Sequence, residues 1–146
     1  FSTLAHYLDR VKAHAARTGH TETYFGRKRY FEGIKSSVPF IRASAERMAI
    51  NAPIQGTTAD IIKRATVSLD RYIKKEGLES DVRLLLQIHD ELIYEIRNNK
   101  VKTVVPAIES IMESVISPKE TGGFTFSVDA SVGNNWGDMK RYDTTQ

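Results

Sequence analysis

The clearest fold signal in this 146-residue chain is the stretch Leu84-Leu85-Leu86-Gln87-Ile88-His89-Asp90-Glu91-Leu92-Ile93-Tyr94-Glu95-Ile96. Two short, mostly apolar runs flank a polar insert of three residues. Each run has the length of a strand, and its leucine, isoleucine and tyrosine side chains suit a half-buried sheet. We therefore predict a β-hairpin over residues 84–96, with His89, Asp90 and Glu91 at its bend.

The two adjacent carboxylates at this bend point to a possible metal site. Asp90 and Glu91 repel each other unless water or a cation neutralises them, and Mg²⁺ prefers carboxylate oxygen atoms while it keeps several waters. One or two such carboxylates and a substrate phosphate would make a plausible site. An ordinary polar turn is the alternative, since aspartate is common in turns. The stretch alone leaves both interpretations open.

The composition limits the class of protein. Charged residues make up 27% of the chain and hydrophobic residues 40%, as in soluble globular proteins. The sequence contains no apolar run of membrane-spanning length, so we expect no membrane partner. It contains no cysteine, which excludes disulfides and thiolate zinc sites and fits a reducing compartment such as the cytoplasm. Because the first residue is Phe1 within a helical pattern, we interpret the chain as part of a longer protein.

Charge is unevenly distributed along the sequence. Residues 1–47 carry nine Lys/Arg and four Asp/Glu, whereas the remaining residues carry twelve and fourteen. This distribution favours a polyanion partner for the first part and a cation site in the second. Within a predicted hairpin over residues 20–31, the triplet Arg27-Lys28-Arg29 lies between aromatic residues and could hold a phosphate backbone. A solvated hairpin tip explains the triplet equally well.

Hydrophobic residues at helical spacing predict a first helix that ends at Gly19 and a second that begins near Pro39. Pro53 lacks a backbone donor, so we expect it to kink or split this second helix. Thr57 and Asp60 have the spacing of a capping box and predict a new helix start after the break.

A further helix is predicted over residues 101–116, and residues 124–132 alternate between apolar and polar side chains as a strand does. The predicted fold class is therefore α+β. We expect an antiparallel sheet formed by the hairpin 84–96 and the strand 124–132, with helices packed on one face.

Arg47, Asn51 and Gln55 follow one another at intervals of four, so they would form one stripe if the helix were continuous. Their side chains offer many hydrogen-bond donors along a short line. Such a line suits the minor groove of a duplex, where every correct base pair presents acceptors at similar positions. An exposed polar helix face without a partner is the alternative.

Two segments resemble the family A DNA polymerases, the bacterial DNA polymerase I type. They are Asn51-Ala52-Pro53-Ile54-Gln55-Gly56-Thr57-Thr58-Ala59-Asp60-Ile61-Ile62-Lys63 and Leu86-Gln87-Ile88-His89-Asp90-Glu91-Leu92. Three shorter segments are also similar to that family: Thr23…Gly26-Arg27-Lys28-Arg29, Arg42…Glu46-Arg47 and Val132-Gly133-Asn134-Asn135-Trp136. The resemblance covers nearly the whole chain, and its two main motifs are long and keep their order.

The resemblance implies that residues 36–146 are the C-terminal part of a polymerase palm and that residues 1–35 form the base of the fingers, with a connecting helix and the basic hairpin. It implies template-directed transfer of a nucleotide from a dNTP to a primer 3′-hydroxyl, with two Mg²⁺ ions and primer–template DNA as partner. Asp90 matches the metal-binding catalytic aspartate of the family, and Glu91 matches the neighbouring acid. The residues that match DNA contacts are His89, Arg42, Arg47, Asn51 and Gln55.

The family's other essential aspartate and its nucleotide-gripping fingers helix have no match in this sequence. We therefore expect the chain alone to be inactive and to depend on the remainder of a parent polymerase. Two alternatives remain at this stage: a non-catalytic nucleic-acid-binding module, or the palm of a single-subunit RNA polymerase. Glu91 argues against the latter, since serine is typical after the aspartate there. A Mg²⁺-dependent nuclease is a weaker alternative because the chain shows no second acidic cluster.

Overall fold

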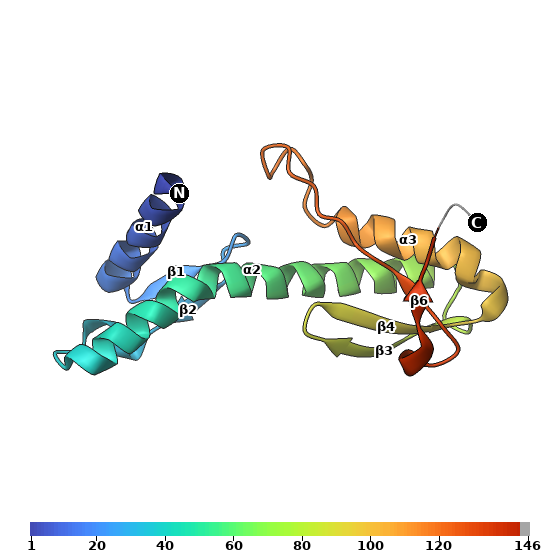
Figure 1. Cartoon of the computed structure of the whole chain (residues 1–146), viewed down its shortest axis with the longest axis horizontal. Helices are drawn as coiled ribbons and strands as arrows, with labels where there is room; N and C mark the ends of the chain where they lie inside the picture. Colours follow the sequence, from blue (N-terminus) through green and yellow to red (C-terminus); the bar gives the residue numbers. More distant parts are fainter. Residues whose placement is uncertain (144–146) are drawn as a thin grey trace. The chain divides into compact units, whose positions relative to one another are not determined.

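The computed structural model describes residues 1–143 (Figure 1). The chain divides into two compact units, one that ends at Asp60 and one that begins at Ile61, and helix α2 (Pro39–Lys75) contributes to both. Helices and small antiparallel sheets make up the described part, so the predicted α+β class is confirmed. No helix within this part is apolar enough over a sufficient length to cross a membrane.

The first unit begins with helix α1 (Ser2–Thr18) and a short hairpin, both as predicted. Gly19 ends α1 with a left-handed φ of 82°, and its N–H donates to the Ala15 carbonyl at 2.8 Å; glycine adopts this conformation without steric cost. Strands β1 (His20–Glu22) and β2 (Lys28–Tyr30) then pair in antiparallel register. A 3-10 helix η1 (Glu32–Lys35) leads to α2.

The core of the first unit is built largely from small side chains. Its buried members are Ala15 of α1, Phe31 and Ile34 around η1, and Ala45, Ala49 and Ala52 of α2. Alanine lets the backbones of neighbouring elements approach closely, and it also has the highest helix propensity. Helix α1 and the segment after the hairpin are therefore held against the first half of α2.

Helix α2 is not split at Pro53, so of the two predicted effects of this proline, a kink or a split, the split is wrong. The helix runs without interruption from Pro39 to Lys75 and contains Pro53 in its interior. Thr57 is not a cap, since its hydroxyl donates to the Pro53 carbonyl at 2.6 Å. Asp60 does not close a capping box either, because its carboxylate accepts a hydrogen bond from Arg27 at 2.7 Å. Tertiary contacts thus outweigh the local cost of a proline inside a helix, which is about 3 kcal/mol.

The second unit contains the end of α2, the hairpin of β3 (Val82–Ile88) and β4 (Glu91–Ile96), the 3-10 helix η2 (Asn98–Lys100) and helix α3 (Val101–Glu113). Its core lies at the open end of the hairpin and comprises Ile73, Leu78, Val82 and Val104, with Tyr72, Tyr94, Ile96 and Ile108 packed against it. The strand members of this core alternate with outward-facing residues, so α2 and α3 cover one face of the hairpin there. This confirms the predicted hairpin, and the helices cover its open end; Leu84, Leu85 and Leu86, nearer the tip, are exposed.

The predicted strand 124–132 is mostly absent. Only β5 (Ser131–Val132) is a strand, and it pairs with β6 (Lys140–Arg141) beside the 3-10 helix η3 (Trp136–Asp138) instead of joining β3 and β4. The alternation of apolar and polar residues gives this segment two different faces, but it does not provide a neighbouring strand to which the backbone can hydrogen-bond. The N–H of Val128 donates to the Glu113 carboxylate at 2.9 Å, and Phe124 is 70% exposed.

Candidate functional site

The tip of the β3–β4 hairpin is tighter than the sequence predicts. The strands pair up to Ile88 and Glu91, so only His89 and Asp90 form the turn and Glu91 is the first residue of β4. His89 has a φ of 53° and is the one non-glycine residue with positive φ in the described part of the chain. Positive φ fits the twist of a two-residue hairpin turn. It costs a non-glycine residue about 1–3 kcal/mol, and such strain is concentrated at functional sites.

The side chains at this tip are free to bind a ligand. His89, Asp90 and Glu91 are all exposed, and within residues 1–143 no hydrogen bond or ion pair engages their side chains. Exposed, unpaired carboxylates are suitable ligands for Mg²⁺, which binds carboxylate oxygen and retains waters. No group of three metal-ligating side chains occurs in the same range, so these two carboxylates would need further ligands from a substrate or another part of a polymerase.

The continuity of α2 places Arg47, Asn51 and Gln55 on one face, because residues four apart in a helix lie above one another. All three are exposed, and their side chains make no hydrogen bond or ion pair with the described residues. The condition set by the sequence prediction, an unbroken helix, is therefore met. We call these three residues the donor row; the row belongs to the first unit and the carboxylate turn to the second.

The basic residues predicted to hold nucleic acid in the hairpin, and Arg42, make contacts within the protein. Arg42 is exposed, but its guanidinium donates to the Ser36 carbonyl at 3.1 Å beside the start of α2. Lys28 lies 3.5 Å from Glu22 in the neighbouring strand. Arg29 stacks over the Phe31 ring, 5.4 Å from its centroid, and is exposed. The basic hairpin thus offers fewer free cations than its sequence suggests.

Arg27 has a role that the sequence did not reveal. Its Nε donates to Asp60 at 2.7 Å and its Nη2 to the Gly56 carbonyl at 3.1 Å, which fastens the hairpin turn to α2. The N–H of Tyr24 donates to the Thr57 hydroxyl at 2.9 Å in the same contact. These partners are about 30 residues apart in sequence, and no periodicity links them. The opposite charges of Arg27 and Asp60 are the one feature of the sequence that could have indicated the pair.

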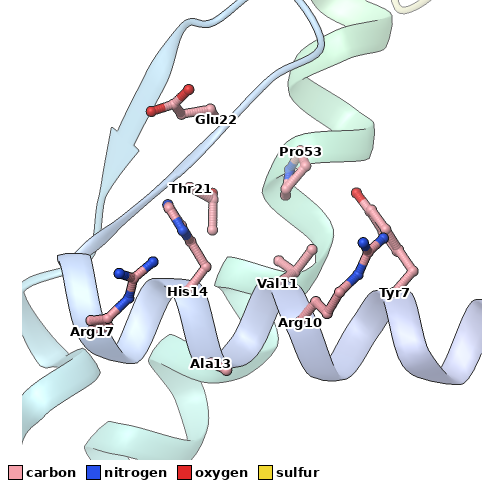
Figure 2. Close-up of a pocket in the computed structure, with 9 residues that line it drawn as sticks. All are labelled: Tyr7, Arg10, Val11, Ala13, His14, Arg17, Thr21, Glu22 and Pro53. Atoms are coloured by element: carbon pink, nitrogen blue, oxygen red, sulfur yellow. The ribbon is translucent and has the colours of Figure 1, made fainter.

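A hollow of about 680 Å³ lies between α1, β1 and α2 of the first unit (Figure 2). Its lining includes Arg10, His14 and Arg17 of α1, Thr21 of β1 and Pro53 of α2. No residue of the donor row or of the carboxylate turn contributes to it. We therefore do not assign the predicted chemistry to this hollow.

Comparison with known proteins agrees with the resemblance found in the sequence. The model of the family described as "DNA polymerase family A" matches residues 1–138. DNA polymerase I of Rhizobium leguminosarum is 42% identical over 136 residues, which are 93% of this chain and 13% of that protein. DNA polymerase I of Pseudomonas aeruginosa is 45% identical over 130 residues, which are 89% of this chain and 14% of that protein.

A solved structure is similar as well. The POL domain of Pol1 from M. smegmatis, in complex with DNA primer-template and dNTP, superimposes with a TM-score of 0.73 and 40% sequence identity. The match covers 77% of this chain and 20% of that one. The present chain thus spans a small part, about one seventh, of the full-length relatives named above.

Proposed function

The chain belongs to DNA polymerase family A, and from this premise we propose that it is the part of a DNA-directed DNA polymerase that carries a catalytic metal ligand and contacts DNA. The observation that carries the proposal is the exposed, unpaired pair Asp90 and Glu91, in and directly after a two-residue turn between paired strands. The reaction would be attack of a primer 3′-hydroxyl on the α-phosphate of a dNTP, with pyrophosphate as the leaving group.

In this proposal Asp90 is a ligand of Mg²⁺, and Glu91 is a secondary ligand or a neighbouring charge. Two Mg²⁺ ions, when bound, activate the attacking oxygen and stabilise charge on the leaving one. The protein's contribution is to hold the Asp90 carboxylate at a fixed place, which the short turn between two paired strands achieves. Because the turn brings only two carboxylates together, the remaining ligands would come from the substrate and from the rest of the parent chain.

The donor row is proposed to contact the minor groove of the primer–template duplex, where its donors meet the acceptors that all correct base pairs share. Arg47 and Gln55 are the stronger candidates, with Asn51 between them and His89 near the primer end. Arg42 is a weaker candidate, because its guanidinium already donates to the Ser36 carbonyl.

The wider context of the chain is also a proposal. We assign residues 36–146 to the palm and residues 1–35 to the base of the fingers of a longer polymerase, which would provide the dNTP-binding side chains. The partners would be primer–template DNA, dNTP and the rest of the parent chain. We also propose a cytoplasmic location, as expected for a relative of the bacterial DNA polymerases named above.

Substitution of Asp90 tests the proposal. In the full-length polymerase that carries this chain, we expect Asp90→Ala to lower single-turnover primer extension by several orders of magnitude while primer–template affinity changes little. Asp70→Ala is the matched control, because Asp70 is an exposed aspartate of α2 that pairs with the exposed Lys74. Extension by Asp90→Ala at the wild-type rate would contradict the proposal. Extension with rNTPs alone would instead favour an RNA polymerase, and DNA binding without Mg²⁺-dependent extension a binding module.

A further inference from the structure

We propose that residues 15–34, through their turn 23–27, act as a splint across Pro53 of α2, and that Asp60 is a positioning residue which, through Arg27, fixes the place of Gln55 relative to Arg47 and Asn51. This inference rests on the DNA-contact role proposed for the donor row. It gives Gly56, Thr57 and Asp60 a role in this contact, in place of the helix cap that the sequence predicted.

Pro53 lies within the stretch of α2 that the donor row spans. Arg47 and Asn51 precede Pro53, whereas Gln55 follows it. Proline cannot donate to the carbonyl four residues earlier, here that of Ala49, and its ring crowds the same carbonyl, which kinks or breaks helices. The direction of the helix after this point sets where Gln55 lies relative to the other two donors. That placement therefore depends on whatever fixes the helix at Pro53.

One continuous segment of the first unit contacts α2 on both sides of that proline. Before Pro53, the buried residues Ala45, Ala49 and Ala52 of α2 share a core with Ala15, Phe31 and Ile34. After Pro53, the turn between β1 and β2 makes three hydrogen bonds to α2. They run from Tyr24 N to Thr57 Oγ1 at 2.9 Å, from Arg27 Nε to Asp60 Oδ1 at 2.7 Å, and from Arg27 Nη2 to the Gly56 carbonyl at 3.1 Å.

The splint also reaches the Pro53 carbonyl. Thr57 Oγ1 accepts from the Tyr24 N–H and donates to the Pro53 carbonyl at 2.6 Å, so one hydroxyl connects the turn to the weakened part of the helix. The turn is held together by its own bonds, from Thr23 N to the Arg27 carbonyl at 2.9 Å and from Arg27 N to Thr23 Oγ1 at 3.2 Å. A rigid turn can transmit the position of Arg27 to Asp60 and to the helix.

The Arg27–Asp60 pair differs from an ordinary surface ion pair. The side chain of Asp60 is only 12% exposed, and Arg27 uses the two arms of its guanidinium for two different acceptors on α2. Lysine cannot reproduce this fork. By contrast, Asp70 and Lys74 on the same helix are 59% and 63% exposed, which makes their pair a suitable control.

The test uses the full-length polymerase. It measures the effects of Gln55→Ala and of Arg47→Ala, each with Asp60 intact and in combination with Asp60→Ala. We expect Gln55→Ala to lower the efficiency of single-turnover extension about tenfold, the loss of one ordinary hydrogen bond. Asp60→Ala should cause a similar loss, and Gln55→Ala should then have no further effect. Arg47 lies before the proline, so Arg47→Ala should lower the efficiency of the Asp60→Ala variant by the same factor as it lowers that of the wild type. The control Asp70→Ala should leave efficiency unchanged.

Arg27→Lys provides a second variant if Asp60→Ala does not fold: it should reduce the effect of Gln55→Ala only in part. The splint is refuted if the Asp60 and Gln55 effects multiply, or if Asp60→Ala lowers the melting temperature alone. A merely structural role would lower stability without this selective loss of the Gln55 effect. If Gln55→Ala and Arg47→Ala both extend like the wild type, the donor row itself fails and the inference with it, which separates the two failures.

Discussion

Gly56 offers a sharp test of how closely the hairpin turn approaches α2. A Cβ added at Gly56 would lie 2.6 Å from Thr23 Cγ2 and 3.3 Å from Arg27 Nη2, so Gly56→Ala has to displace the Thr23 side chain or the turn that carries it. Overpacking of this kind costs about 1–3 kcal/mol, and loss of the bond from Arg27 to the Gly56 carbonyl adds about 1 kcal/mol. The higher helix propensity of alanine stabilises the helix by about 1 kcal/mol relative to glycine. The net expectation is a destabilisation of about 1–3 kcal/mol.

The clashing atom can be removed without loss of the hydrogen bond beside it. Thr23→Ser deletes Cγ2 but keeps the hydroxyl that accepts from the Arg27 N–H. In urea unfolding followed by far-ultraviolet circular dichroism, the double variant Gly56→Ala/Thr23→Ser should therefore regain most of the stability that Gly56→Ala loses. A Gly56→Ala protein about 1 kcal/mol more stable than the wild type would show that helix propensity alone acts there. That result, or a double variant with purely additive losses, would refute the close contact.

Three further predictions concern Leu69, Tyr94 and the activity of the isolated chain. Leu69→Ala should lower the free energy of unfolding by about 2–5 kcal/mol, because Leu69 is fully buried; Val67→Ala, 49% exposed on the same helix, should change it by less than about 0.5 kcal/mol in the same urea titration. Burial raises the pKa of Tyr94 from 10 to about 12, so stability should be intact below pH 10 and decline toward pH 12 in alkaline unfolding, less so in Tyr94→Phe. The isolated 146-residue chain should not extend primers, because residues 1–143 bring no third metal ligand to the turn; robust extension would contradict this.

Local sequence patterns predicted the elements whose causes are local. Gly19 ends α1 because a left-handed residue closes a helix, and the apolar runs around His89 and Asp90 form a hairpin because their neighbours in sequence are also their partners. The start of α2 at Pro39 followed from the same kind of signal, since proline is well suited to a first helical turn. These elements needed no information about the rest of the chain.

The errors arose where distant residues decide the outcome. Pro53 argues for a break in any local analysis, and the helix continues because Tyr24 and Arg27, more than 25 residues earlier, bind the turn that follows it. Alternation over residues 124–132 predicted a strand, but a strand needs a partner edge, and Val128 bonds to the Glu113 side chain instead. For the candidate site, the sequence predicted Asp90, Glu91 and the donor row, which stay predictions, and it did not predict the Arg27–Asp60 contact.

The proposal that Asp90 holds a divalent cation beside the primer end can be tested most directly with Mn²⁺ as a visible substitute for Mg²⁺. Crystals of the full-length polymerase with primer–template DNA and dNTP, grown with Mn²⁺, would be measured at the manganese absorption edge. An anomalous peak at about 2.0–2.2 Å from an Asp90 carboxylate oxygen is the predicted result. Manganese bound at the dNTP phosphates of an extension-competent complex, with none in contact with Asp90, would contradict it.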